Sequence, residues 1–260
     1  MMKNNVCRLM KEEYIAGYGM IDITPDKNLI VNSWNEFIIS YISGKKIEKG
    51  GSLRITIPHF FTDPQINNDQ IIGYTALSSN NKIKASLRIN SSYGCGYEND
   101  GHTGRYGKSI FVNLPDGMNP RAKLSIIYGK KSKKNKGVRA PYFASKAYFI
   151  TAVDPYGDNR ASISGYYHLE EQSAVTVTAR KGQQAIIYIP SVNKNTKNQG
   201  VIHIADKEEN IDNLFQGKIK LYSNTSGVKL PENISFSKKD KGKKIFKFTN
   251  LLIKCRIMNG

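Results

Sequence analysis

Short runs of β-branched and aromatic residues recur along this 260-residue chain, and several alternate apolar with polar residues at a period of two. The run 53–57 shows this alternation, and so does the run 82–89. Successive side chains of a β-strand point to opposite faces of a sheet, so this period predicts strands with one apolar face. No segment keeps a helical apolar period over several turns, and we therefore expect no long helix.

Turn-forming clusters separate these runs at intervals that are typical of β-sandwiches. The 22 glycines and nine prolines suit such frequent turns. We expect a loop at 207–215, because Asn and Asp are frequent there. The other predicted strands are 38–42, 122–128, 147–153, 175–179, 184–189, 201–205, 217–222 and 244–248. The chain is thus predicted to be all-β, with two consecutive β-sandwich modules.

A change of composition between Ser162 and Ser173 divides the two modules. The first series of strands ends in the turn Asp154-Pro155-Tyr156-Gly157, and a new series begins at Val175. We place the boundary near residue 170, with the N-terminal β-sandwich over 12–169 and the second over 170–260. Each module has an ordinary domain size.

Basic residues outnumber acidic ones, and the formal net charge is +18. Such a surplus attracts anions, including nucleic acid, acidic polysaccharide and anionic membrane. The longest apolar runs are too short to span a membrane as a helix. No apolar segment follows the basic start of the chain, so we expect no signal peptide and, by default, a cytoplasmic protein.

The residues that usually carry chemistry show no recognisable pattern. The three cysteines, Cys7, Cys95 and Cys255, have no CxxC spacing, which predicts neither a disulfide framework nor a zinc site. The chain lacks the nucleophile elbow, the HExxH motif, the P-loop and the EF-hand loop. No two histidines have metal-ligand spacing, and His203 in an apolar strand is interpreted as structural. We predict no catalytic residue, no metal and no cofactor, and a protein that is not an enzyme.

A Gly- and Tyr-rich segment, the Gly/Tyr loop (93–107), interrupts the strand pattern. Long loops in compact domains often carry function. Glycine lets the backbone approach a ligand closely, and Tyr and Arg offer stacking and hydrogen bonds. We predict a surface for a sugar-like ligand, the alternative being a structural connection held by tyrosine packing. The candidate ligand-binding residues are Tyr93, Tyr97, His102, Arg105 and Tyr106.

Positive charge gathers in two segments, a lysine loop (130–137) and a C-terminal stretch (238–247). The candidate anion-binding residues are Lys130, Lys131, Lys133, Lys134, Lys136 and Arg139. The alternative is a solvated lysine surface. Specific nucleic-acid binding is not expected, because aromatic residues do not alternate with these lysines. The single tryptophan, Trp34, precedes a strand and is expected in the core.

Several motifs recur in a fixed order. Trp34 leads into the run 37–42, Gly50-Gly51 follows, and Gly137-Val138-Arg139-Ala140 and 149–157 come later. This order resembles the N-terminal region of a family of uncharacterised microbial multidomain proteins. In that family a β-sandwich module is followed by an immunoglobulin-like module, and longer members carry a C-terminal metal-dependent hydrolase domain of the polymerase-and-histidinol-phosphatase (PHP) type.

The resemblance implies an immunoglobulin- or filamin-like second module, and the acidic segment 205–210 is similar to a turn of filamin-like repeats. Nothing in this chain matches the metal ligands of the family's hydrolase domain, so no catalytic residue is transferred. Fewer strands can be placed after residue 170 than the roughly seven of an immunoglobulin module. We therefore hypothesise an incomplete second module in a fragment of a longer protein.

Four functions remain open from the sequence. The first is a non-catalytic accessory or binding protein that resembles the N-terminal part of a larger metal-dependent hydrolase. The second is a glycan- or anion-binding protein that uses the Gly/Tyr loop and the lysine loop, with carbohydrate or another anion as partner. The third is a carbohydrate-active enzyme acting through Glu98, Asp100 and His102. The fourth is nonspecific nucleic-acid binding, motivated by the net charge alone.

Overall fold

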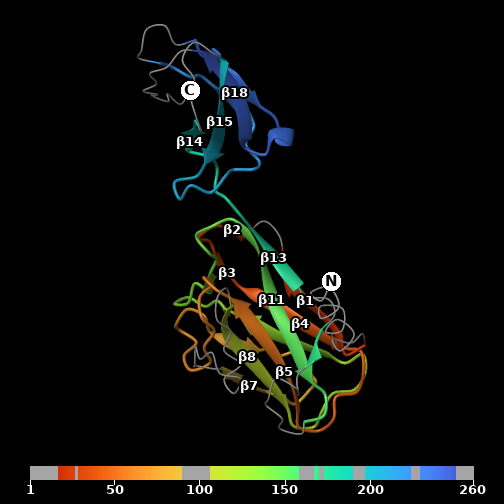
Figure 1. Ribbon diagram of the computed structural model, residues 1–260. Helices are drawn as coiled ribbons and strands as arrows, with labels where there is room; N and C mark the ends of the chain where they lie inside the picture. The colour runs from red at the N-terminus through yellow and green to blue at the C-terminus, as the bar shows by residue number, and fades with distance from the viewer. Residues whose placement is uncertain are drawn as a thin grey trace. The chain divides into compact units, whose positions relative to one another are not determined.

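The computed structural model describes residues 17–26, 29–89, 106–157, 167–169, 173–189, 197–223 and 229–249. Over these ranges the protein is all-β, as predicted (Figure 1). The only helical element there is a single 3₁₀ turn, η3 (Lys238–Asp240). No helix in the described ranges is long and apolar enough to cross a membrane.

The chain divides into two compact units, one of residues 1–141 and 145–177 and the other of residues 142–144 and 178–260. The two hydrophobic cores have no residue in common. The division falls later than the predicted boundary near residue 170, because β13 (Ser173–Thr178) pairs antiparallel with β11 (Ser145–Asp154) of the first unit. Val175 and Val177 of β13 are buried in the first core. The strand that we assigned to the second module therefore belongs to the first unit.

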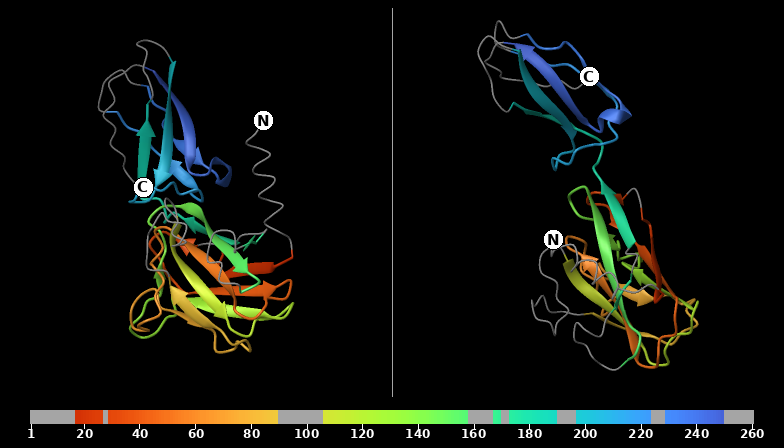
Figure 2. Two further views of the ribbon diagram at one scale, coloured as in Figure 1. Left: turned by 60° about the horizontal axis from the view of Figure 1, so that its bottom comes forward. Right: turned by 45° about the vertical axis from the view of Figure 1, so that its right-hand side comes forward.

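The first unit is a β-sandwich of two main antiparallel sheets (Figure 2). The smaller sheet has the order β1 (Gly19–Thr24), β4 (Phe37–Ser43), β9 (Lys123–Tyr128) and β6 (Thr75–Leu77). The larger has the order β2 (Leu29–Ile30), β13, β11, β5 (Gly51–Pro58), β8 (Tyr106–Leu114) and β7 (Ser86–Ile89), with β12 (Tyr167–His168) beside β11. A separate ribbon pairs β3 (Trp34–Asn35) with β10 (Val138–Arg139). Side chains from both main sheets form one core.

Alternation along β4 and β5 shows why the two sheets pack together. Ile39 and Tyr41 of β4 and Leu53 and Ile55 of β5 are almost fully buried and belong to the same core. The intervening Ile38 is 44% exposed, as expected for the outer face of a strand. Burial also raises the pKa of the Tyr41 phenol to about 12, so this side chain packs as a neutral group.

The second unit also has two sheets around one core. One sheet has the order β14 (Gln184–Tyr188), β15 (Lys197–Ala205) and β18 (Lys243–Thr249), and the other pairs β16 (Gly217–Ile219) with β17 (Ile234–Phe236). Ile202 and Phe246 from the first sheet pack in the same cluster as Phe236 from the second. A sandwich-like second unit was predicted, and its segment 207–215 contains no helix. Residues 250–260, on which the hypothesis of an incomplete second module depends, lie outside the described residues.

Candidate functional site

The lysine loop connects β9 to β10 and is built around one buried amide. Asn135 is only 1% exposed. Its Nδ2 donates to the carbonyls of Asp69 at 3.2 Å and Lys130 at 3.0 Å, and its Oδ1 accepts the Gly137 N–H at 2.8 Å. Gly137 has φ +99°, and a Cβ there would lie 2.2 Å from the Asn35 carbonyl. The loop therefore has a defined conformation although its surface is charged.

Two of the six candidate anion-binding residues fasten this loop to its surroundings. The Lys131 N–H donates to Glu36 Oε2 at 2.6 Å, and Lys131 Nζ donates to the Trp34 carbonyl at 3.1 Å. Lys134 Nζ donates to Gln70 Oε1 at 3.2 Å. Both ammonium groups already have hydrogen-bond acceptors within the protein, so Lys131 and Lys134 are poorer candidates for ligand contacts.

The other four candidates present unpaired charge. All are exposed, and none has an acidic group at salt-bridge distance within the described part of the chain: Lys130, Lys133, Lys136 and Arg139. A cation on a loop of fixed shape loses less entropy on binding than one on a mobile segment. The loop and the adjoining β10 thus hold four cations ready for an anion.

Trp34 lies beside these cations rather than in the core, where we expected it. Its side chain is half-buried, because β3 belongs to a short ribbon outside the two main sheets. In that ribbon Trp34 is directly opposite Arg139, and directly opposed residues share one face of an antiparallel pair. The indole and the guanidinium therefore lie on the same face. Sequence reasoning missed this pairing because about a hundred residues separate the two positions.

The Gly/Tyr loop falls mostly outside the described residues, including its candidates Tyr93, Tyr97, His102 and Arg105. Tyr106, which we placed in this loop, is instead the first residue of β8, and it pairs with Pro58 at the end of β5. Its assignment to the loop was wrong, because the pairing of β8 with β5 extends to this residue, whereas its role in ligand binding stays a prediction.

The start of β8 and the lysine loop lie at the same end of the first unit. Shortly after Pro58, the Thr62 N–H donates to the Arg139 carbonyl at 3.2 Å, and Thr62 Oγ1 accepts the Arg139 N–H at 2.9 Å. Lys108 of β8 forms a 3.2 Å ion pair with Asp63 next to Thr62. The structure therefore brings the C-terminal anchor of the Gly/Tyr loop to the end of the unit that carries Arg139.

A buried tyrosine, Tyr128, lies beneath this end of the first unit. The Tyr128 hydroxyl donates to the Thr62 carbonyl. Burial raises the pKa of the Tyr128 phenol well above its ordinary value, and the negative charge of Asp63 acts in the same direction. Tyr128 therefore stays protonated at neutral pH and keeps this hydrogen bond, which holds the Thr62 segment against β9.

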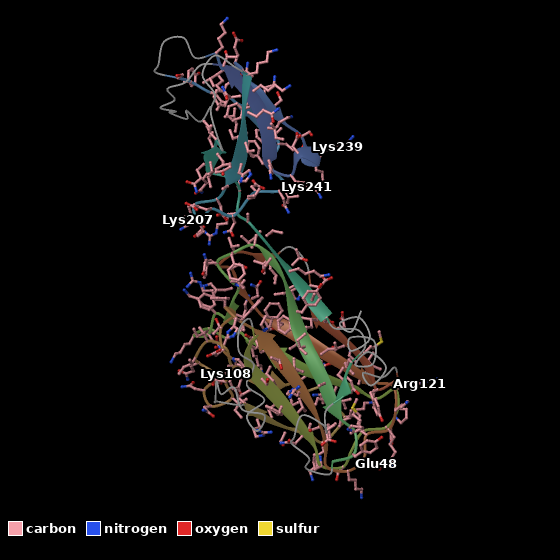
Figure 3. The ribbon with its side chains drawn as sticks, viewed as in Figure 1. Glu48, Lys108, Arg121, Lys207, Lys239 and Lys241 are labelled. Carbon is pink, nitrogen blue, oxygen red and sulfur yellow. The ribbon has the colours of Figure 1, made fainter. Side chains whose placement is uncertain are left out.

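The C-terminal lysine stretch belongs to the second unit. Figure 3 shows Lys239 and Lys241 at η3, and both are exposed. Lys244 forms a 3.3 Å ion pair with Asp240. Hydrogen bonds from the Ser237 backbone and hydroxyl lower the pKa of the Asp240 carboxyl. The two basic segments thus reside on separate units.

Metal-ligating side chains do not gather within the described ranges, where no group of three or more His, Cys, Asp or Glu residues could hold an ion. His203 is half-buried in β15, opposite Lys243 of β18, and its Nε2 has no hydrogen-bond partner among the residues that the structure describes.

No family model matches this chain, and no curated protein matches it. Solved structures with partial similarity include the Escherichia coli adhesin FdeC, with a TM-score of 0.34 and 13% identity over 90% of this chain and 55% of that chain. A family GH18 chitinase from Chromobacterium violaceum has a TM-score of 0.27 and 11% identity over 56% and 19% of the two chains. WR4, a C. elegans MSP family member, has a TM-score of 0.23 and 10% identity over 62% and 98%. This chain spans little more than half of the FdeC structure, and likeness at this level carries no argument about function.

Replacing Asn135 by alanine is expected to destabilise the first unit by about 2 kcal/mol, because two carbonyls and the buried Gly137 N–H lose their partner. The Gly137 N–H donates to Asn135 Oδ1, so hydrogen exchange at this amide should accelerate in the variant. Denaturant unfolding and amide exchange measure the two effects. The exposed Asn80 serves as a control, and its Asn80→Ala variant should unfold like the parent protein. An unchanged Gly137 exchange rate in Asn135→Ala would show that the loop does not depend on this amide.

Proposed function

We propose that this chain is a non-catalytic binding protein whose first unit recognises an acidic polysaccharide through the lysine loop and its neighbour Trp34. The observation that carries the proposal is the fixed loop with Lys130, Lys133, Lys136 and Arg139 exposed and without acidic partners in the described residues. Ammonium groups attract the carboxylates or sulfates of such a polymer. The half-buried indole offers an apolar face for a sugar ring.

The position of β8 supports the same proposal. Its first residue lies at the same end of the first unit as the lysine loop, and the Gly/Tyr loop joins β8 there. A polymer along this end would meet the lysine loop and then the anchor of a segment rich in tyrosine and glycine. The resemblance to the PHP-associated family supports an accessory role, in which these modules bind or space while a separate domain supplies catalysis.

The test is binding of heparin, polygalacturonate and neutral dextran by titration calorimetry over a series of salt concentrations. The triple variant Lys130→Ala/Lys133→Ala/Lys136→Ala should weaken binding of an acidic polymer about tenfold or more and flatten its salt dependence. The matched control removes the same charge from the second unit, in Lys238→Ala/Lys239→Ala/Lys241→Ala, and should bind almost as well as the parent. Trp34→Ala should weaken binding of the polysaccharide but not binding of inorganic polyphosphate, which has no sugar ring to stack on the indole.

Equal weakening by the two triple variants would overturn the proposal, since net charge alone would then explain the binding. Tighter binding of a 20-base-pair DNA duplex than of either acidic polysaccharide, measured at the same salt concentration, would also overturn it in favour of nucleic acid. If neutral dextran bound with the same affinity as heparin, the lysines would have no role in recognition, and the proposal would fail.

A further inference from the structure

A second basic site lies in the first unit, in an open pocket of about 580 Å³. Three segments form its walls, namely the β4–β5 turn, the chain before β7 and the β8–β9 turn. The lining residues that matter below are Lys46, Glu48, Lys49, Lys82, Lys84 and Asp116. The volume is within the ordinary range for small-molecule sites, roughly 300–1,000 Å³.

Two of the three walls are held together by the backbone. Ile47 and Met118 exchange hydrogen bonds, from the Ile47 N–H to the Met118 carbonyl at 2.8 Å and from the Met118 N–H to the Ile47 carbonyl at 2.9 Å. Gly117 between them has φ +73°, and a Cβ there would lie 2.3 Å from the Ile47 carbonyl. The Glu48 N–H donates to the Pro155 carbonyl at 2.8 Å. The pocket is thus preformed rather than assembled by a ligand.

The pocket combines an apolar floor with a cationic rim. Ile47 is 1% exposed and Met118 4% exposed, and Ile83 packs against the same core. Around them, four lysines and two carboxylates, Glu48 and Asp116, leave a net charge of +2. Lys46 forms a 2.8 Å ion pair with Glu48.

The remaining three lysines of the rim come from two different walls. Lys49, Lys82 and Lys84 are exposed, and none has an acidic partner at salt-bridge distance among the residues that the structure describes. A dianion that enters the pocket would therefore meet ammonium groups from two sides, while its carbon body would lie against the apolar floor.

We propose that this pocket binds a small phosphate monoester, with the phosphate between Lys49 and the pair Lys82 and Lys84 and the carbon body against the half-buried Ile83, above Ile47 and Met118. A phosphate monoester carries a charge of about −1.5 to −2 at neutral pH, which matches the net charge of the lining. Lysine binds phosphate as a point charge and needs no fixed fork geometry, so exposed lysines suffice.

The pocket is separate from the lysine loop. Ala122, which lines the pocket, precedes β9, and Lys130 follows the end of that strand. Six residues of strand hold the two sites about 17 Å or more apart. In Figure 3 Glu48 lies at the bottom of the first unit, away from Lys108, whose partner Asp63 is near the lysine loop. The two sites can therefore be tested independently.

The experiment uses the full chain and isothermal titration with four probes: glucose 6-phosphate, adenosine monophosphate, inorganic phosphate and glucose. Glucose 6-phosphate or the nucleotide should bind at least fivefold more tightly than inorganic phosphate, because the floor adds apolar contact, and glucose should not bind measurably. The two esters distinguish a sugar phosphate from a nucleotide as the source of the phosphate. Lys82→Ala/Lys84→Ala should weaken the better ester about tenfold, whereas the matched lysine-loop variant Lys130→Ala/Lys133→Ala should leave it unchanged.

Three results would overturn this proposal. Inorganic phosphate that binds as tightly as both esters would remove the role of the floor. Equal weakening by the two double variants would assign the binding to the general field of the protein. Absence of binding for both esters would exclude the phosphate site. None of these results affects the proposed polysaccharide site, whose test depends on Lys130, Lys133, Lys136 and Trp34.

Discussion

Replacing Phe37 by alanine is expected to lower the free energy of unfolding of the first unit by about 4 kcal/mol. Phe37 is fully buried in β4. Its ring centroid lies 5.9 Å from that of Phe61, 5.8 Å from that of Tyr128 and 5.9 Å from that of Phe149. Removal of this ring loses its burial and leaves a cavity between three rings from three different segments, which cannot all move to fill it.

Differential scanning calorimetry measures this loss as a fall of about 10 °C in the melting temperature of the first unit. Because the second unit has its own core, its transition should not move. The neighbouring Ile38 points outward and is 44% exposed, so Ile38→Ala is the matched control and should change stability by less than about 1 kcal/mol. A Phe37→Ala protein that melts like the Ile38→Ala protein would show that the aromatic cluster does not hold the sandwich together.

The aromatic cluster also shows how sequence patterns succeed and fail for this fold. Strand-like runs in the sequence correctly located β4, β5 and β9, although β5 is buried on both faces. Alternation remains visible in β5 because buried polar residues, Arg54 and Thr56, separate its apolar ones. The same reasoning missed β8, in which Phe111 is buried on the face opposite Ile110 and Val112, because three successive apolar residues show no alternation.

Long-range pairing explains the other difference. The segment 175–179 has the composition of a strand, but only its pairing with β11 decides which unit it joins. Local sequence contains no information about that partner, so the predicted boundary near residue 170 fell before β13 instead of after it.

The candidate site was predictable in part for the same reason. Clustered lysines identify the lysine loop, because charge density is a local property of the sequence. The loop's shape depends on Asn135, whose partners Asp69 and Lys130 cannot be read from its neighbours. The place of Trp34 beside Arg139 likewise follows from a ribbon that joins distant segments. The charge of the site was thus predictable, whereas its rigidity and its aromatic neighbour were not.

Replacing Asp206 by alanine is expected to destabilise the second unit by about 3 kcal/mol. Asp206 is completely buried at the end of β15. Its Oδ1 accepts the N–H groups of Glu208 and Asn210, each at 3.0 Å, and its Oδ2 accepts the Arg180 N–H at 3.1 Å. Alanine would remove the acceptor of three part-buried N–H groups and with it three charge-assisted hydrogen bonds.

The same carboxylate connects two parts of the second unit through Asn210. The Asn210 Nδ2 lies 3.2 Å from Asp206 Oδ1 and also donates to the Tyr142 carbonyl at 2.8 Å, while Asn210 Oδ1 accepts the Ala144 N–H at 2.8 Å. Loss of Asp206 should therefore loosen the segment 142–144 as well as the turn 206–210. This explains structurally why an acidic residue and an asparagine occur together in the segment 205–210.

Calorimetry of Asp206→Ala should show a fall of more than 10 °C in the melting temperature of the second unit and no change in that of the first unit. Phe37→Ala should show the opposite pattern. The neighbouring Lys207 is exposed, and its side chain forms a surface ion pair with Glu208. Lys207→Ala is therefore the matched control. Hydrogen exchange at the Ala144 amide provides a local measurement, and it should accelerate in Asp206→Ala alone. Equal stability of the Asp206→Ala and Lys207→Ala proteins would mean that the buried donors find water instead, and that the turn 206–210 is not a structural centre of the second unit.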